Sequence, residues 1–155
     1  MPFDVVRQQL DYQIAFGDLL NRIPEDIVLS QFAGAALDRF NPGTATIYFK
    51  GEVPPEVVSL VGSAGVSGIQ LQGGMRYSNE DLKTLKRAVV DTVKELGYSQ
   101  LTLSIEPGTQ RLELLVVDYP GSSFTTASEL AEAIAIRLDD TFQVAPHDLM
   151  VEIRP

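Results

Sequence analysis

His147 is the only histidine of the chain, and it lies between Pro146 and Asp148. A catalytic histidine needs a nucleophile or a substrate proton within hydrogen-bond reach, and no serine of the chain occupies a Gly-x-Ser-x-Gly turn. A metal site would need further nitrogen or sulfur ligands, and the chain has no cysteine. We therefore interpret His147 as a solvated turn residue and expect no catalytic residue, no metal site, no cofactor and no enzymatic activity.

Two adjacent glycines, Gly73 and Gly74, stand shortly before Ser78 and the start of a predicted helix. A glycine-rich turn that leads into a helix can bind a phosphate group. This segment lacks the lysine and the spacing of a P-loop, and the Gly-x-Gly-x-x-Gly pattern of dinucleotide sites is absent from the chain. We interpret the two glycines as a bend and Ser78 as a helix cap.

The charge balance argues against some classes of partner. The 155 residues include 21 acidic and 12 basic ones, which gives a net charge of −9. This charge opposes binding to nucleic acid, whose phosphates attract Lys and Arg, and it suits either a basic partner or simple solubility. Apolar runs such as residues 114–117 are far too short to span a bilayer. We expect neither nucleic acid nor a membrane as a partner.

A repeated turn sequence indicates how the chain is organised. The triplet Pro-Gly-Thr occurs at residues 42–44 and again at 107–109, each time between segments that are typical of strands. A helical pattern precedes each hairpin, and a shorter helix and a strand follow it. The sequence therefore predicts an α+β fold with two α-β-β-α-β units, at 1–75 and 76–155, each a three-stranded sheet packed on helices.

The first unit is expected to begin with a helix over residues 4–22, with Val6, Leu10, Ile14 and Leu20 on its apolar face. A connector should lead to strands at 34–40 and 44–50. Pro54 and Pro55 are typical of a helix start, and a strand at 69–72 should complete the sheet.

The second unit is expected to begin with a helix from Ser78 to Leu96, whose apolar stripe includes Leu82, Leu85, Val89 and Val93. Gly97 suits the left-handed end of that helix. Strands at 101–105 and 111–117, a helix from 126 to 138 and a strand at 150–153 should follow. Of the sheet's two edges, we expect one to be the final strand or the second hairpin strand.

Several short segments in this order resemble a known family. Phe32-Ala33-Gly34 precedes the first hairpin, and Arg76-Tyr77-Ser78 opens the long helix that contains Leu82. In these short motifs, and in the order of its elements over nearly the whole chain, the protein resembles the pro-region of α-lytic protease and of streptogrisin-type secreted bacterial serine proteases.

The resemblance implies a function and a partner. Such pro-regions assist the folding of a trypsin-like serine protease and inhibit it, and the sheet of their C-terminal subdomain pairs with a protease hairpin, a form of β-augmentation. By position, this sheet would comprise 99–106, 111–117 and 149–153. The partner-binding residues that the resemblance implies are Leu114, Val116, Met150, Val151, Glu152, Ile153, Arg154 and Pro155.

Two other functions compete with this one. The chain could be a stand-alone interaction or regulatory module with another partner, or an enzyme or small-ligand binder with a pocket between its two units. The compartment depends on the choice. The first twenty residues contain Asp4, Arg7, Asp11 and Asp18 and lack the apolar segment of a signal peptide. We expect an extracellular protein if the resemblance holds and a signal peptide was removed, and a cytoplasmic one otherwise.

Overall fold

The computed structural model describes residues 3–106 and 108–155, without the side chains of residues 139–141. The chain forms helices and two separate three-stranded sheets, which confirms the predicted α+β class. Its contacts divide it into two compact units, the first ending at Glu80 and the second beginning at Asp81. The sequence had suggested a division after residue 75, which lies at the end of the last strand of the first unit.

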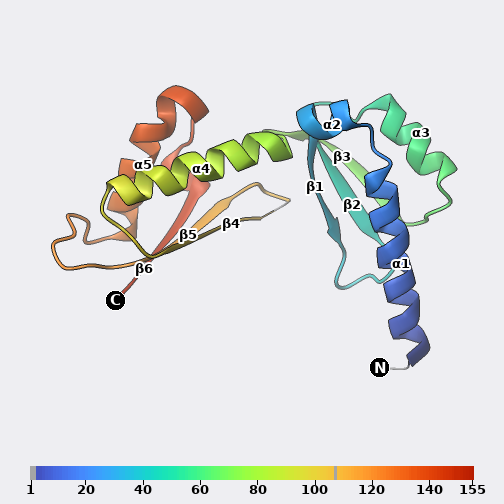
Figure 1. Cartoon of the computed structure of the whole chain (residues 1–155), viewed down its shortest axis with the longest axis horizontal. Helices are drawn as coiled ribbons and strands as arrows, with labels where there is room; N and C mark the ends of the chain where they lie inside the picture. The colour runs from blue at the N-terminus through green and yellow to red at the C-terminus, as the bar shows by residue number, and fades with distance from the viewer. Residues whose placement is uncertain (1–2, 107) are drawn as a thin grey trace. The chain divides into compact units, whose positions relative to one another are not determined.

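The first unit contains one sheet and three helices (Figure 1). Its sheet has the order β1-β2-β3, in which β2 is antiparallel to β1 and parallel to β3. The strands are β1 (Phe32–Leu37), β2 (Ala45–Lys50) and β3 (Ile69–Met75). The helices are α1 (Phe3–Asn21), α2 (Glu25–Ser30) and α3 (Pro55–Ser63).

The second unit repeats this order of strands. Its sheet has the order β4-β5-β6, again with an antiparallel hairpin followed by a parallel strand. The elements are α4 (Asn79–Glu95), β4 (Leu101–Ile105), β5 (Leu112–Val117), α5 (Ala127–Phe142), the short 3-10 helix η1 (Pro146–Asp148) and β6 (Leu149–Arg154). The predicted repeat of hairpin, helix and strand is confirmed, although Pro107 of the second turn lies outside the described residues.

Two local features of the first unit differ from the prediction. The connector before the first hairpin contains the helix α2, which begins after Pro24 with Glu25 and Asp26 in its first turn, where acidic side chains face the positive helix end. The first strand spans Phe32–Leu37 rather than 34–40: it includes an irregular pairing with β2 between Phe32 and Gly34, and it ends before Asp38, whose carboxylate bonds the turn. Gly34 has a φ of 133°, which glycine adopts without strain.

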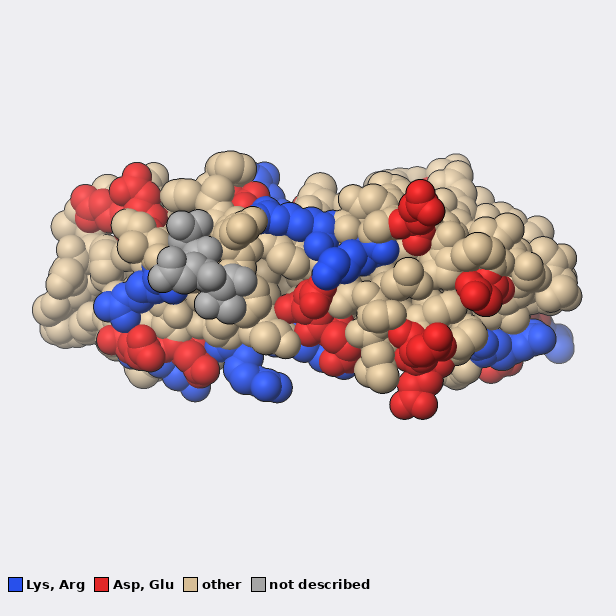
Figure 2. Space-filling model, turned by 90° about the horizontal axis from the view of Figure 1, so that it is seen from above, with Lys and Arg blue, Asp and Glu red and all other residues tan. Residues whose placement is uncertain are grey.

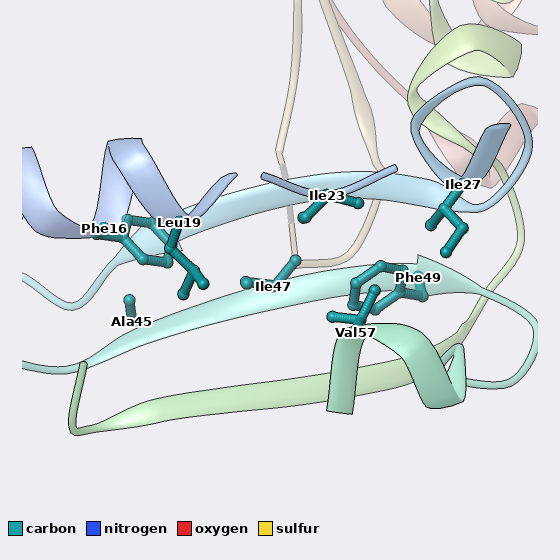
Figure 3. Packing of buried hydrophobic residues seen from close by; sticks show 8 residues of the cluster. All are labelled: Phe16, Leu19, Ile23, Ile27, Ala45, Ile47, Phe49 and Val57. Atoms are coloured by element: carbon teal, nitrogen blue, oxygen red, sulfur yellow. The ribbon is translucent and has the colours of Figure 1, made fainter. Parts of the chain in front are cut away.

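The core of the first unit uses a different face of α1 from the one predicted. Phe16 and Leu19 of α1 are buried against Ile47 and Phe49 of β2 and Val57 of α3 (Figure 3). The prediction is wrong for Val6, Leu10 and Ile14, which are exposed to solvent, whereas Leu20 is partly buried and packs against this core.

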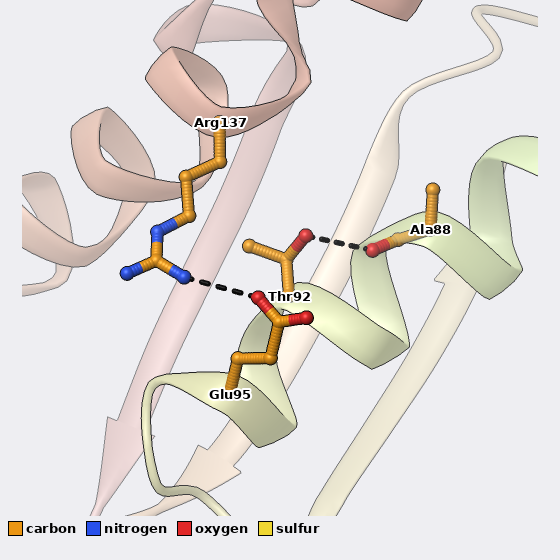
Figure 4. Close-up of polar contacts among 4 residues, drawn as sticks. All are labelled: Ala88, Thr92, Glu95 and Arg137. Carbon is orange, nitrogen blue, oxygen red and sulfur yellow. Dashed lines mark hydrogen bonds and ion pairs between the residues drawn. The ribbon is translucent and has the colours of Figure 1, made fainter.

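In the second unit the predicted face of α4 is confirmed, since Leu82, Leu85, Val89 and Val93 are all buried. Thr92 is also buried, and its hydroxyl donates a hydrogen bond of 2.8 Å to the Ala88 carbonyl within the same helix. At the surface, Arg137 of α5 forms an ion pair of 3.1 Å with Glu95 of α4 (Figure 4). Both groups are largely solvated, so this pair contributes little to stability.

The first hairpin turn is organised by a carboxylate. Asp38 accepts hydrogen bonds from the side-chain amide of Asn41 at 2.9 Å and from the backbone N–H of Phe40 at 2.8 Å. These bonds, that of Asn41 first, lower the pKa of the Asp38 carboxyl below its usual value. The ionised form of Asp38 therefore stabilises the turn.

A lowered pKa makes the contribution of Asp38 depend on pH. Its stabilising effect should be complete above the unfolded-state pKa of about 3.9 and should disappear as the pH falls through the lower folded-state pKa. Asp38→Ala should lower the urea midpoint of unfolding at pH 7. The difference in midpoint between this variant and the unmodified chain should narrow below about pH 4. A difference in midpoint of the same size at pH 7 and pH 3 would contradict stabilisation of the turn by the ionised Asp38. Arg39→Ala, in the same turn, should show no such narrowing.

Candidate protein-binding edge

The sheet order of the second unit separates the predicted partner-binding residues into two groups. Leu114 and Val116 belong to β5, which is the central strand, and both are buried. Of the two strands predicted as the possible edge, the final one is an edge, and the second hairpin strand is not, because β6 adds on the far side of it. Met150, Val151, Glu152, Ile153 and Arg154 all lie on β6, which is an edge strand, and Pro155 follows it.

Hydrogen bonding shows which backbone groups of β6 point away from the sheet. The Arg154 carbonyl accepts a 2.7 Å bond from the N–H of Asp118, just beyond β5. Backbone groups alternate in direction along a strand, so Glu152 and Met150 also point their N–H and C=O groups inward, toward β5. The N–H and C=O groups of Val151 and Ile153 therefore point outward, where no strand of the described residues pairs with them.

The opposite edge, β4, was not expected to be a binding site. The Gln100 carbonyl, just before β4, accepts a 3.1 Å bond from the N–H of Val117, so Leu101, Leu103 and Ile105 point their backbone groups outward. The sequence Leu-Thr-Leu-Ser-Ile carries no charge and no proline, the usual features that keep an edge strand from pairing. This lack of charge was visible in the sequence, although only the sheet order shows that β4 is an edge.

One face of this sheet forms a shallow hollow of about 360 Å³. Met150 and Leu115 supply apolar surface there, and Glu113 and Glu152 supply carboxylates. Arg154 forms an ion pair of 3.1 Å with Glu152 on the exposed side of β6. The hollow therefore combines apolar contact with the carboxylate of Glu113 beside an open strand edge, which suits a partner segment with apolar and basic side chains.

His147 lies on η1, immediately before β6, with its side chain 83% exposed. Its Nε2 is 3.5 Å from an Asp148 carboxylate oxygen, the one polar contact that the described residues make with it. His147 also borders a second hollow of about 340 Å³ together with Ser128 and Glu132 of α5. No hydrogen bond among the described residues joins Ser128 to His147.

A third hollow, of about 370 Å³, lies in the first unit between α1 and the first hairpin turn, with Tyr12, Asp38 and Thr44 among its lining residues. No group of three or more His, Asp or Glu side chains in the described part of the chain could hold a metal ion. None of the helices over the described residues is long and apolar enough to cross a membrane. On the face shown in Figure 2, basic and acidic side chains are interspersed. No protein-family model matches the chain, and no curated protein matches it either.

Proposed function

We propose that this protein is a non-enzymatic protein-binding domain that pairs an extended segment of a trypsin-like serine protease with the edge of β6. Through this pairing it assists the folding of the protease, restrains its activity, or does both. The observation that carries the proposal is the outward direction of the Val151 and Ile153 backbone groups at an open sheet edge. The resemblance to secreted protease pro-regions supplies the class of partner, and with it an extracellular location.

The physical basis is β-augmentation. A partner strand beside β6 would satisfy the outward N–H and C=O groups of Val151 and Ile153, and each such bond contributes about 0.5–1.5 kcal/mol net. Side chains of the added strand that point to the open face of the sheet would lie near Met150 and Glu152, which border the hollow. Backbone bonds would thus give affinity, and the hollow would favour apolar and basic side chains.

A proline at residue 151 tests this pairing. Val151→Pro removes an N–H that points away from β5, so the internal ladder should survive, whereas the added strand loses one donor and meets the proline ring. We expect the dissociation constant for a streptogrisin-type protease, its catalytic serine replaced to prevent digestion, to rise roughly 10- to 100-fold in calorimetry. Circular dichroism should first show an unchanged fold.

Leu103→Pro is the matched control, because residue 103 also points its N–H outward, at the β4 edge. It should leave binding unchanged. Loss of binding for Leu103→Pro alone would move the docking edge to β4 and overturn the assignment to β6. An unmodified domain that binds none of several such proteases, folded or refolding, would favour a stand-alone module with another partner.

A further inference from the structure

The hollow beside His147 borders β6 on the face of the sheet opposite Met150. It has a volume of about 340 Å³ and is lined by residues of α5, η1 and β6, so we name it the α5–β6 hollow. None of the described residues of β5, the neighbouring strand, lines it. The α5–β6 hollow therefore lies at the outer margin of the sheet, on the side where a strand would be added to β6.

The α5–β6 hollow has buried apolar residues at its base and polar ones at its border. Ala131 of α5 and Leu149 of β6 are each 6% exposed and, together with the half-buried Val151, offer methyl groups to it. The exposed side chains of Ser128 and Glu132 border it from α5. Alanine and serine at these positions of α5 leave space that larger side chains would fill. An apolar side chain that entered this space would be removed from water, which favours binding.

The alternation of side chains along a strand connects this hollow with the one on the open face of the sheet. In β6, Leu149 and Val151 point to the face that α5 covers, whereas Met150 and Glu152 point to the open face. Residues opposite each other on neighbouring strands project to the same face. On a strand added beside β6, the residue opposite Val151 would therefore point toward the α5–β6 hollow, and its two neighbours would point to the open face.

We propose that the α5–β6 hollow is an anchoring site for one large apolar side chain, such as leucine, of the strand that adds to β6. This inference rests on the strand pairing proposed above, although not on the partner's being a protease. The neighbours of the anchoring residue would lie on the open face near Glu113, which forms no ion pair among the described residues. Basic side chains suit these two positions. The partner segment should thus have the order basic, large apolar, basic.

A short peptide tests the anchoring site without a protease. The peptide Thr-Thr-Lys-Leu-Lys-Thr-Thr, blocked at both ends, has the proposed order, and its symmetric sequence fits either strand direction. Titrated into the isotopically labelled full chain, it should shift the amide resonances of Ala131, Leu149 and Val151, with a dissociation constant of about 50–500 μM. Replacing its leucine by alanine keeps the charge and should raise this constant roughly 10-fold, because the anchor loses most of its apolar contact.

A variant that fills the α5–β6 hollow separates anchoring from general apolar attraction. Ser128→Leu should raise the dissociation constant of the leucine peptide roughly 10-fold and that of the alanine peptide less than about 2-fold. Ser123→Leu makes the same exchange at an exposed serine that does not line the hollow, and it should change neither constant. The comparison of the two peptides on the unmodified chain requires no variant to fold. Equal affinities for the two peptides, or no binding of the leucine peptide at ~5 mM, would overturn the proposal.

The protease experiment distinguishes a failure of this inference from a failure of the proposed function. Preference for the leucine peptide, without binding of any streptogrisin-type protease, would support the anchoring site and overturn the protease as partner. Protease binding that Val151→Pro weakens and Ser128→Leu leaves unchanged, together with equal affinities for the two peptides, would support pairing at β6 and overturn the anchoring site.

Discussion

Leu85→Ala should lower the free energy of unfolding of the protein by about 2–5 kcal/mol, the range for truncation of a fully buried leucine. Leu85 lies in the middle of α4, with 0% of its surface exposed, on the same face as Val89 and Val93, which are also fully buried. The substitution removes the apolar contacts of the leucine and leaves a cavity that helix and sheet can close only in part. Urea unfolding followed by circular dichroism would measure the loss.

Lys86→Ala is the control for Leu85→Ala. It changes the neighbouring residue of the same helix on the exposed side and keeps a good helix former, so its effect should stay within about 0.5 kcal/mol. A Leu85→Ala protein with the stability of the parent would show that this face of α4 is not the core of the second unit.

Gly97→Ala should lower the free energy of unfolding by a similar amount, about 2–5 kcal/mol, because the added methyl group has no room. Gly97 ends α4 with a φ of 103°, and the N–H of Tyr98 returns to the Val93 carbonyl at 3.2 Å. A Cβ at residue 97 would lie 2.8 Å from the Cζ atom of Tyr119 and closer still to its hydroxyl oxygen. That hydroxyl donates a 2.8 Å hydrogen bond to the Leu96 carbonyl, so the ring cannot move away without losing the bond.

Gly121→Ala separates the backbone strain of a positive φ from the clash with the Tyr119 ring. Gly121 also has a positive φ, of 90°, but a Cβ there would meet nothing within 4 Å. Its substitution should therefore carry only the backbone strain, about 1–3 kcal/mol, and the difference between the two variants measures the clash at Tyr119. Equal losses for the two would contradict a steric role for Tyr119. Thermal unfolding at matched pH gives both values.

The two long helices show what an apolar stripe can and cannot predict. In α4, most positions between Leu82, Leu85 and Val89 are charged or polar, so one face alone could form a core, and that prediction is confirmed. In α1, apolar residues occupy more than one face, and both Leu10 and Phe16 belong to plausible stripes. Periodicity identifies faces that could be buried, but burial depends on which tertiary surface meets the helix.

In the sheets, too, some features could be predicted from the sequence and others could not. The Pro-Gly-Thr turns and the strand patterns predicted both hairpins, because turn chemistry and alternation are local properties. The position of the third strand is not local. Its parallel pairing with β5 places Leu114 at the centre of the sheet, and neither the turn nor the alternation in the hairpin specifies that pairing. The helix α2, by contrast, could have been predicted from Pro24 and the two acidic residues after it.

In the candidate site, too, local features could be predicted from the sequence and the pairing of distant strands could not. That the final strand is an edge agrees with the prediction from the chain order, whereas the outward direction of Val151 depends on the register with β5, which only the structure gives. The sequence does not predict that β4 is an edge, because this depends on β6 pairing with β5 rather than with β4.

Amide hydrogen exchange, followed by NMR in the labelled chain, tests the proposed pairing most directly. Without a partner, the outward N–H groups of Val151 and Ile153 should exchange rapidly, whereas the inward ones of Glu152 and Arg154 should be protected. With an inactive streptogrisin-type protease bound, Val151 and Ile153 should become protected, and Leu101 and Leu103 on β4 should not change. Binding that leaves Val151 and Ile153 in rapid exchange would contradict strand addition at β6.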